Sequence, residues 1–250
     1  MSSEIKCSFT KDNIDTYLKE VSKIYRKLVG KKLPAEIILI GGASILINYS
    51  FRNSTADIDA IIESASAMED AIKMVRDKNN LSNDWLNSDF SKTSSFSPKI
   101  AQYSKFYKTY SNIVTVRTIN SEYLIAMKLR AGRQYKHDLS DILGILLEHE
   151  KKGTPITIEQ IHEATENLYG SWKVLSNHSI QFIEGVFNNS KTIQQQYEEV
   201  RAGEIEAREK LIALNRSYPD VLTSNNVDTI AYELQKRTDR NSLLNILRKR

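Results

Sequence analysis

The stretch EIILIGGASILINYSFRNSTADIDAII, residues 36–62, decides the fold. It opens with an apolar run, residues 37–40, of the kind that forms a buried strand. Gly41 and Gly42 end this run, and residues 43–49 then have apolar side chains at helical spacing. The stretch therefore predicts a strand that breaks at two glycines into a short helix.

The glycine pair and the start of the predicted helix suit a phosphate. The first backbone N–H groups of a helix have no partner within it, and this end carries a partial positive charge. Ser44 adds a hydroxyl in the first turn. A Gly-Gly pair is most often only a turn, so this half of the stretch is weak evidence when it is taken alone.

The second half of the stretch supplies two carboxylates, Asp57 and Asp59. Side chains alternate faces in a strand, so both are predicted on one side, with their Cβ atoms roughly 6–7 Å apart. Like charges this close repel unless a cation lies between them. Magnesium, which takes carboxylates together with substrate phosphates, is the expected cation. The alternative is an ordinary exposed edge strand.

The order of these features resembles the nucleotidyltransferase superfamily. The pattern of that superfamily is a strand, Gly-Gly/Ser, a helix, and Asp-x-Asp on the next strand. The resemblance implies that Asp57 and Asp59 bind Mg²⁺ and take part in catalysis. By the same resemblance the nucleotide-binding residues are Gly41, Gly42, Ser44 and Arg52.

A second informative stretch contains Lys128, Asp138 and Asp141. From the residues alone, Lys128 is a lysine that packs its stem and solvates its head, and the two acids are helix-start carboxylates favoured by the helix dipole. A Leu-x-x-x-Lys helix, then Arg, then an Asp-x-x-Asp helix resembles the AbiEii family. That family comprises the toxins of type IV toxin–antitoxin and abortive-infection systems, with related uncharacterised bacterial nucleotidyltransferases. The resemblance implies that Lys128 contacts a phosphate and that Asp138 completes the catalytic site.

The sequence departs from the superfamily pattern in one respect. The superfamily commonly places a third carboxylate on a later strand, where it helps to bind metal and deprotonates the acceptor. The two later strands predicted here, residues 101–107 and 113–119, contain no acid. Either another residue such as Asp138 does this work, or transfer is weak or absent.

The predicted architecture is α/β (α+β), with two domains. Residues 1–153 are expected to form a nucleotidyltransferase-like mixed sheet with flanking helices, and residues 154–250 an all-α domain. Beyond Pro155 the strand patterns vanish and helical patterns continue towards the basic C-terminal end.

Composition limits the partners and the cellular location that are compatible with the sequence. The chain has 250 residues and a formal net charge of +4, which is compatible with nucleotide or nucleic-acid partners without requiring them. Cys7 is the single cysteine, so an intrachain disulfide is excluded and a reducing, cytoplasmic location is expected. No run of about 18 apolar residues occurs, so no membrane partner is expected.

The first predicted helix, residues 11–29, ends in a basic segment. Two interpretations are open: compensation of the helix dipole with a gain in solubility, which we favour, and a nucleic-acid patch. The basic residues are Lys23, Arg26, Lys27, Lys31 and Lys32.

The expected function is metal-dependent transfer of a nucleoside monophosphate from a nucleoside triphosphate to an acceptor, either RNA (such as tRNA) or protein. A toxin role with a cognate antitoxin follows from the AbiEii resemblance. Two alternatives stay open. One is an antibiotic-type nucleotidyltransferase that acts on a small molecule. The other is a degenerate, non-catalytic protein that binds a nucleotide or a partner.

Overall fold

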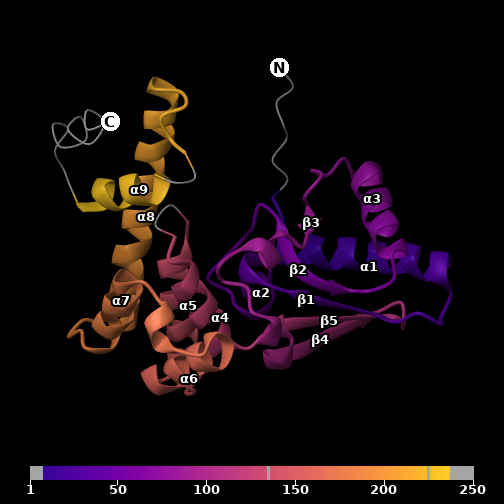
Figure 1. Cartoon of the computed structure of the whole chain (residues 1–250), viewed down its shortest axis with the longest axis horizontal. Helices are drawn as coiled ribbons and strands as arrows, with labels where there is room; N and C mark the ends of the chain where they lie inside the picture. Colours follow the sequence, from indigo (N-terminus) through magenta and orange to yellow (C-terminus); the bar gives the residue numbers. More distant parts are fainter. Residues whose placement is uncertain (1–7, 134–135, 224–225, 237–250) are drawn as a thin grey trace. The chain divides into compact units, whose positions relative to one another are not determined.

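The computed structural model describes residues 8–133, 136–223 and 226–236 (Figure 1). These residues form two compact units. Unit 1 comprises the chain up to Met127 together with Ile161–Trp172, and unit 2 comprises Lys128–Gln160 with the chain from Lys173 onward. The domain boundary predicted after residue 153 stays a prediction. The basic C-terminal end, residues 237–250, lies outside the described residues.

Unit 1 is built on a mixed five-stranded sheet with the order β3-β2-β1-β5-β4. The central strand β1 runs antiparallel to β2 and parallel to β5. β2 pairs in parallel with β3, and β4 pairs antiparallel with β5. The strands are β1 Ala35–Leu39, β2 Ile58–Glu63, β3 Leu86–Asn87, β4 Ser104–Tyr110 and β5 Val114–Ile119. The predicted mixed α/β architecture is confirmed.

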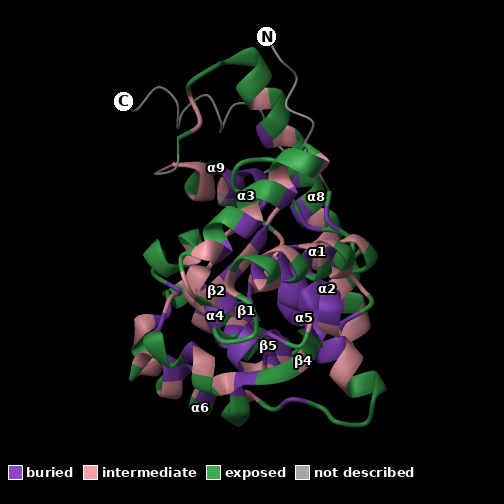
Figure 2. Ribbon diagram, turned by 90° about the vertical axis from the view of Figure 1, so that its right-hand side faces the viewer, coloured by how far each residue is buried: buried purple, intermediate pink, exposed green. Residues whose placement is uncertain are grey.

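Two helices, α1 and α3, build the core of unit 1 on one face of this sheet. Ile14, Leu18 and Val21 of α1 are fully buried in a core that also contains residues of β1, β2 and β5. Figure 2 shows the buried segments of the chain in purple. α1 ends at Gly30, which has a φ of +69° and closes the helix where the sequence predicts its end. The helices of unit 1 are α1 Lys11–Val29, α2 Gly41–Asn48, α3 Ala67–Asn79, most of α4 Ser121–Ala131 and most of α6 Ile158–Tyr169.

Two predicted strands begin later in the structure than the sequence indicates. The strand expected at residues 101–107 begins as a 3-10 helix, Pro98–Tyr103, because proline suits a first helical turn and the Ser97 hydroxyl accepts from the Lys99 N–H (3.3 Å). The strand itself is β4. Asp57 lies in the bend that precedes β2, since the strand begins one residue later.

Unit 2 consists of helices in its described part, as predicted for the region after Pro155. The long helix α8 begins with a capping box between Thr192 and Gln195 and packs on both α5 and α9. Leu211 of α8 packs with α9. The helices are α5 Asp138–Lys151, α7 Asn177–Phe187, α8 Ile193–Ser217 and α9 Val227–Lys236, with a 3-10 turn at Trp172–Val174.

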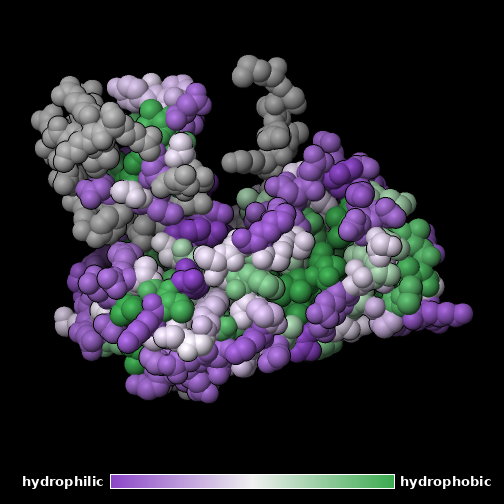
Figure 3. Space-filling view, in the orientation of Figure 1, coloured by the Kyte–Doolittle hydropathy of each residue, from purple (hydrophilic) through white to green (hydrophobic). Residues whose placement is uncertain are grey.

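No described helix is long and apolar enough to cross a membrane. The face drawn in Figure 3 mixes hydrophilic and hydrophobic residues, with a hydrophobic area in the region of β1 and β2.

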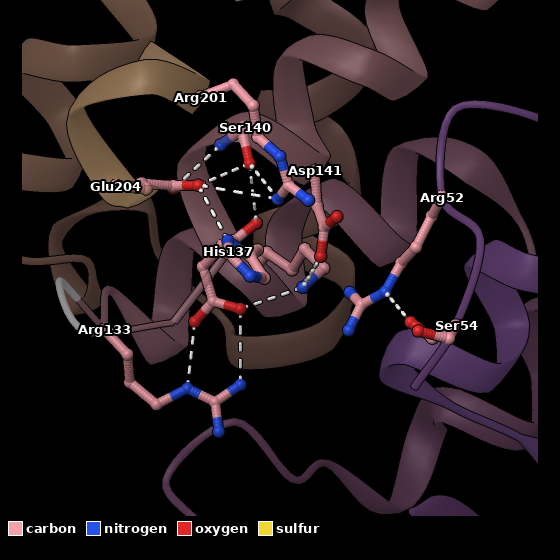
Figure 4. Close-up of polar contacts among 10 residues, drawn as sticks. Arg52, Ser54, Arg133, His137, Ser140, Asp141, Arg201 and Glu204 are labelled. Atoms are coloured by element: carbon pink, nitrogen blue, oxygen red, sulfur yellow. Dashed lines mark hydrogen bonds and ion pairs between the residues drawn. The ribbon is translucent and has the colours of Figure 1, made fainter. Parts of the chain in front are cut away.

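A buried carboxylate joins α8 to the start of α5. Glu204 is 4% exposed, and its Oε1 accepts the backbone N–H of Ser140 at 3.1 Å. Its Oε2 accepts from the Ser140 hydroxyl and lies 3.2 Å from His137 Nδ1 (Figure 4). Glu204 therefore acts as an N-terminal cap for α5, supplied by another helix.

We expect Glu204→Ala to lower the free energy of unfolding by about 3 kcal/mol, because a buried helix start loses its hydrogen-bond acceptor and its negative charge. Urea unfolding followed by circular dichroism measures this. The matched control is Glu206→Ala, an exposed residue two positions along α8, which should change stability by less than about 0.5 kcal/mol. Equal losses in both variants would contradict the capping role.

Candidate active site

The carboxylate of Asp59 lies beside the glycine pair of unit 1. The Ile40 N–H donates to the Asp59 carbonyl oxygen at 2.9 Å, so the end of β1 is tied to β2 at this residue. Gly41 follows with a φ of +53°, and a Cβ built there would lie 3.7 Å from Asp59 Oδ2. The β1–α2 turn therefore uses a backbone conformation that favours glycine, directly against a carboxylate.

Gly42 has no room for a side chain. A Cβ at this position would lie 2.5 Å from Thr55 Oγ1 and 3.1 Å from Arg52 Nη2. The Arg52 guanidinium also donates through Nε to the Ser54 carbonyl at 3.0 Å. Thr55 is held in turn by two backbone hydrogen bonds with Phe9, each 2.8 Å. The predicted residues Gly41, Gly42, Arg52 and Asp59 therefore come together in unit 1.

Asp57 precedes Asp59 by two residues and is half-buried, like Asp59. In the described parts of the chain, no three His, Cys, Asp or Glu side chains group into a metal site. Two carboxylates still suit Mg²⁺, which typically binds one or two protein carboxylates and completes its shell with substrate phosphates and water. The donor set fits the predicted cation.

Ser44 faces the inside of the fold. It is fully buried, and its Oγ accepts the backbone N–H of Ile119 at 3.2 Å, which ties α2 to the end of β5. Asn48 Nδ2 donates to the Ser44 carbonyl at 2.9 Å on the same helix. The predicted contact of Ser44 with a triphosphate stays a prediction, and the burial of the hydroxyl weighs against it.

The end of β5 beside β1 carries a threonine and no carboxylate. Thr118 pairs with Leu39 in the sheet register and is 1% exposed. Its hydroxyl donates to Asn48 Oδ1 at 3.3 Å. β4 and β5 contain no acid, SKFYKTY and VTVRTI respectively, so the departure seen in the sequence persists in the fold.

Lys128, Asp138 and Asp141 form a buried ion-pair cluster in unit 2. Lys128 Nζ lies 2.8 Å from a carboxylate oxygen of each acid, and all three residues are at most 6% exposed. Arg133 adds a two-point contact to Asp138, with Nε at 2.9 Å and Nη2 at 3.3 Å (Figure 4). The solvated lysine expected from the residues alone is wrong, because the ammonium is enclosed by carboxylates.

The cluster sets the protonation of Asp138. Burial by itself raises the pKa of this carboxyl, but Lys128 and Arg133 outweigh burial and hold the pKa well below its usual range. A carboxylate with a strongly lowered pKa is a weak base, and both of its oxygens are already hydrogen-bonded. These contacts weigh against Asp138 as the residue that deprotonates an acceptor.

Sequence reasoning missed Arg133 and Glu204. Arg133 lies five residues before Asp138, where no helical or strand period connects the two. Glu204 lies 64 residues from its partner Ser140. It belongs to α8, a helix of mixed charge in which many of the other acidic residues are exposed. A buried acid among exposed ones leaves no signal in a single sequence, since burial depends on packing.

A mixed sheet whose central strand breaks at two glycines beside a carboxylate of the next strand defines the chain as nucleotidyltransferase-like. A family model supports this class. It is described as "Nucleotidyltransferase of unknown function (DUF6036)" and matches residues 16–198, so the chain belongs to this family. Neither a curated protein nor a solved structure matches the chain.

We expect Asp138→Asn to lower the free energy of unfolding by about 3 kcal/mol at neutral pH, because Lys128 and Arg133 lose a buried partner. The folded-state pKa of Asp138 is lowered, so its stabilisation is complete above about pH 4 and is lost as the pH falls further. The variant should therefore lose less stability than the wild type between neutral and acidic pH. Urea unfolding across this range measures both effects.

The control for this prediction is Glu209→Gln, a neutralised exposed acid on α8 of the same unit, which should unfold like the wild type. A loss in Asp138→Asn no larger than the loss in this control would show that the cluster contributes little to stability.

We expect Gly42→Ala to cost about 2 kcal/mol of folding free energy, because the new methyl group overlaps Thr55 and Arg52. Gly185→Ala is the control. Gly185 lies in α7 with open space around its Cβ position, so alanine there should stabilise the protein by up to about 1 kcal/mol. Thermal unfolding measures the stability of both variants. An unchanged stability in Gly42→Ala would show that Thr55 and Arg52 can move aside at little cost in free energy.

Proposed function

We propose that this chain transfers a nucleoside monophosphate from a nucleoside triphosphate to an acceptor, with release of pyrophosphate. The observation that carries the proposal is the placement of the Asp59 carboxylate against Gly41, with the Arg52 guanidinium against Gly42. A phosphate group needs donors and positive charge on one side and a cation on the other. This corner of unit 1 offers the start of α2 and the Arg52 guanidinium on one side, and on the other the Asp59 carboxylate, which would help to hold the cation.

The residues take distinct roles in this proposal. The backbone amides at Gly41 and Gly42 open α2, where the helix dipole favours an anion, and Arg52 adds a full positive charge. Asp57 and Asp59 would hold Mg²⁺. When bound, this cation neutralises phosphate charge and stabilises the leaving pyrophosphate. The amides at the start of α2 and the Arg52 guanidinium would position the α-phosphorus for in-line attack and stabilise the negative charge of the transition state.

Activation of the acceptor is the open part of the mechanism. Neither β4 nor β5 carries an acid, and Asp138 is engaged by Lys128 and Arg133. We propose that Lys128 and Asp138 stabilise unit 2 and do not take part in catalysis. The missing acid favours a second candidate function, a nucleotide-binding protein without transfer activity.

The finer biological role rests on resemblance. The Leu-x-x-x-Lys and Asp-x-x-Asp helices support an AbiEii-like toxin in the cytoplasm, with RNA or protein as acceptor and a cognate antitoxin as partner. The antibiotic-type alternative on a small molecule has no specific observation in its favour.

We expect the double variant Asp57→Asn/Asp59→Asn to reduce transfer at least about a hundredfold, since a metal-centred electrostatic contribution of about 3 kcal/mol to the barrier is lost. EDTA should abolish wild-type transfer. The assay incubates purified protein, radiolabelled triphosphates and Mg²⁺ with total RNA or cell lysate and follows label on a macromolecule. Asp70→Asn/Asp84→Asn, two exposed acids of the same unit, is the charge-matched control and should transfer normally.

Label transfer that survives in the Asp57→Asn/Asp59→Asn variant would refute the mechanism. A folded Asp138→Asn protein without transfer activity would identify Asp138 as the third carboxylate. Mg²⁺-dependent triphosphate binding without transfer to any acceptor would favour the binding-only candidate.

A further inference from the structure

A cationic groove lies in unit 1, away from the glycine pair. Its volume is about 850 Å³, and its walls are α1 on one side and the end of β4 with the turn to β5 on the other. The lining residues of this groove, called the α1–β4 groove here, are Asp15, Thr16, Lys19, Lys23, Arg26, Lys27, Lys108, Thr109, Tyr110 and Ser111.

Positive charge is concentrated in the α1–β4 groove. The lining holds five lysine or arginine side chains and one carboxylate, a net of +4. The formal net charge of all 250 residues is also +4. The rest of the chain is therefore balanced, and the groove accounts for the whole excess.

Three of these cations lie outside the ion pairs of the described residues. Lys108 pairs with Asp15 at 2.9 Å, and Arg26 Nη1 donates to the Ser111 carbonyl at 2.8 Å. Lys19, Lys23 and Lys27 are exposed and form no ion pair with any described residue. They recur every four residues on one face of α1, where like charges repel and weaken a helix.

The helix dipole explains only part of this arrangement. A cation is stabilised by the dipole in the last turn of a helix, which in α1 contains Arg26 and Lys27. Lys19 and Lys23 lie before that turn. Lys23 also acts on the Glu20 carboxylate, which is already paired with Lys78. The remaining positive charge on this face of α1 exceeds what the dipole and Glu20 account for, so the groove suits an anionic ligand.

The wall opposite α1 is held in place by hydrogen bonds. The hydroxyls of Tyr107 and Tyr110 both donate to Asp15 Oδ1, the first at 2.9 Å. Burial and Asp15 raise the pKa of Tyr107 to about 12, so this hydroxyl stays a donor at neutral pH. The Asp15 carboxylate is therefore bound by side chains of β4 and does not form an ion pair with the lysines of α1 that line the groove.

We propose that the α1–β4 groove binds the phosphate backbone of a nucleic-acid strand. Lysines four residues apart on a helix are spaced by about 6 Å along its axis, comparable with consecutive phosphates of one strand. Lysine binds phosphates as a point charge, so a row of three lysines suits a row of phosphates without a fixed two-point geometry. The groove has one arginine, and Ser111 already engages it.

The groove reaches from the end of the sheet opposite the glycine pair to the middle of β1. Ser111 follows Tyr110 at the end where β1 begins with Ala35, and Lys108 lies level with Ile37 through Val116. Gly41 follows the other end of β1, so roughly 13–16 Å of strand separates the groove from the glycine pair. A bound strand could therefore be held by the groove without contact with the triphosphate. A role in holding the acceptor rests on the proposed function, whereas binding itself does not.

The test uses the full-length triple variant Lys19→Gln/Lys23→Gln/Lys27→Gln and a fluorescently labelled single-stranded RNA. Fluorescence anisotropy is measured over a range of salt concentrations, without triphosphate or Mg²⁺. We expect at least a tenfold loss of affinity at moderate salt, and a slope of log K against log[salt] that is shallower by about 2, near 0.7 per lost phosphate contact.

The charge-matched control is Lys11→Gln/Lys31→Gln/Lys32→Gln, three exposed lysines of the same unit outside the groove. It should keep nearly wild-type affinity. Equal losses in the two triple variants would overturn the proposal, since net charge alone would then explain binding. Unchanged affinity in the groove variant would overturn it as well.

Competition experiments separate the possible ligands. Single-stranded DNA of the same sequence tests whether the sugar contributes to binding. Competition by DNA as well as RNA, or by RNA alone, is compatible with a site that binds the phosphate backbone. Poly-glutamate that displaces RNA equally well at equal charge would overturn the proposal in favour of an acidic protein. Mg²⁺-dependent triphosphate binding should be unchanged in the groove variant, so a failed transfer mechanism and a failed groove are distinguishable.

Discussion

The close approach of β2 and the preceding segment to the β1–α2 turn constrains the rest of unit 1. Gly41 adopts a φ of +53° beside the Asp59 carboxylate, and Gly42 leaves no space between its Cα and the side chain of Thr55. A larger residue would be strained by the positive φ at Gly41 and would overlap Thr55 and Arg52 at Gly42. The same constraint that lets the chain turn also places a carboxylate and a guanidinium beside the first backbone amides of α2, so folding and the candidate chemistry depend on the same two glycines.

Unit 2 shows how differently similar residue types behave once they are buried. Asp59 is half-buried near a glycine turn, whereas Asp138 is 1% exposed and is enclosed by Lys128 and Arg133. A buried charge cluster of this kind costs desolvation and is strongly destabilised when one member is removed.

Local patterns predicted much of the fold. The apolar run and glycine pair located β1 and α2, and helical spacing with Gly30 gave the bounds of α1. Gly41, Gly42, Arg52 and Asp59 lie together in unit 1, and their binding of a nucleotide or a metal stays a prediction. What failed depended on contacts between distant residues. The buried state of Ser44 is set by Ile119 and that of Lys128 by α5, and no period in the sequence records either.

The two edges of the sheet in unit 1 bear on the solubility of the chain. A strand edge with unpaired backbone groups is a template for pairing with another molecule, and proteins protect such edges. At one edge β3 has only two residues. At the other, β4 carries Lys105 and Lys108, and a bulge between Phe106 and Lys108 interrupts its register. The bulge leaves Tyr107 outside regular pairing while its hydroxyl reaches Asp15. One irregularity therefore both secures α1 and discourages edge-to-edge aggregation.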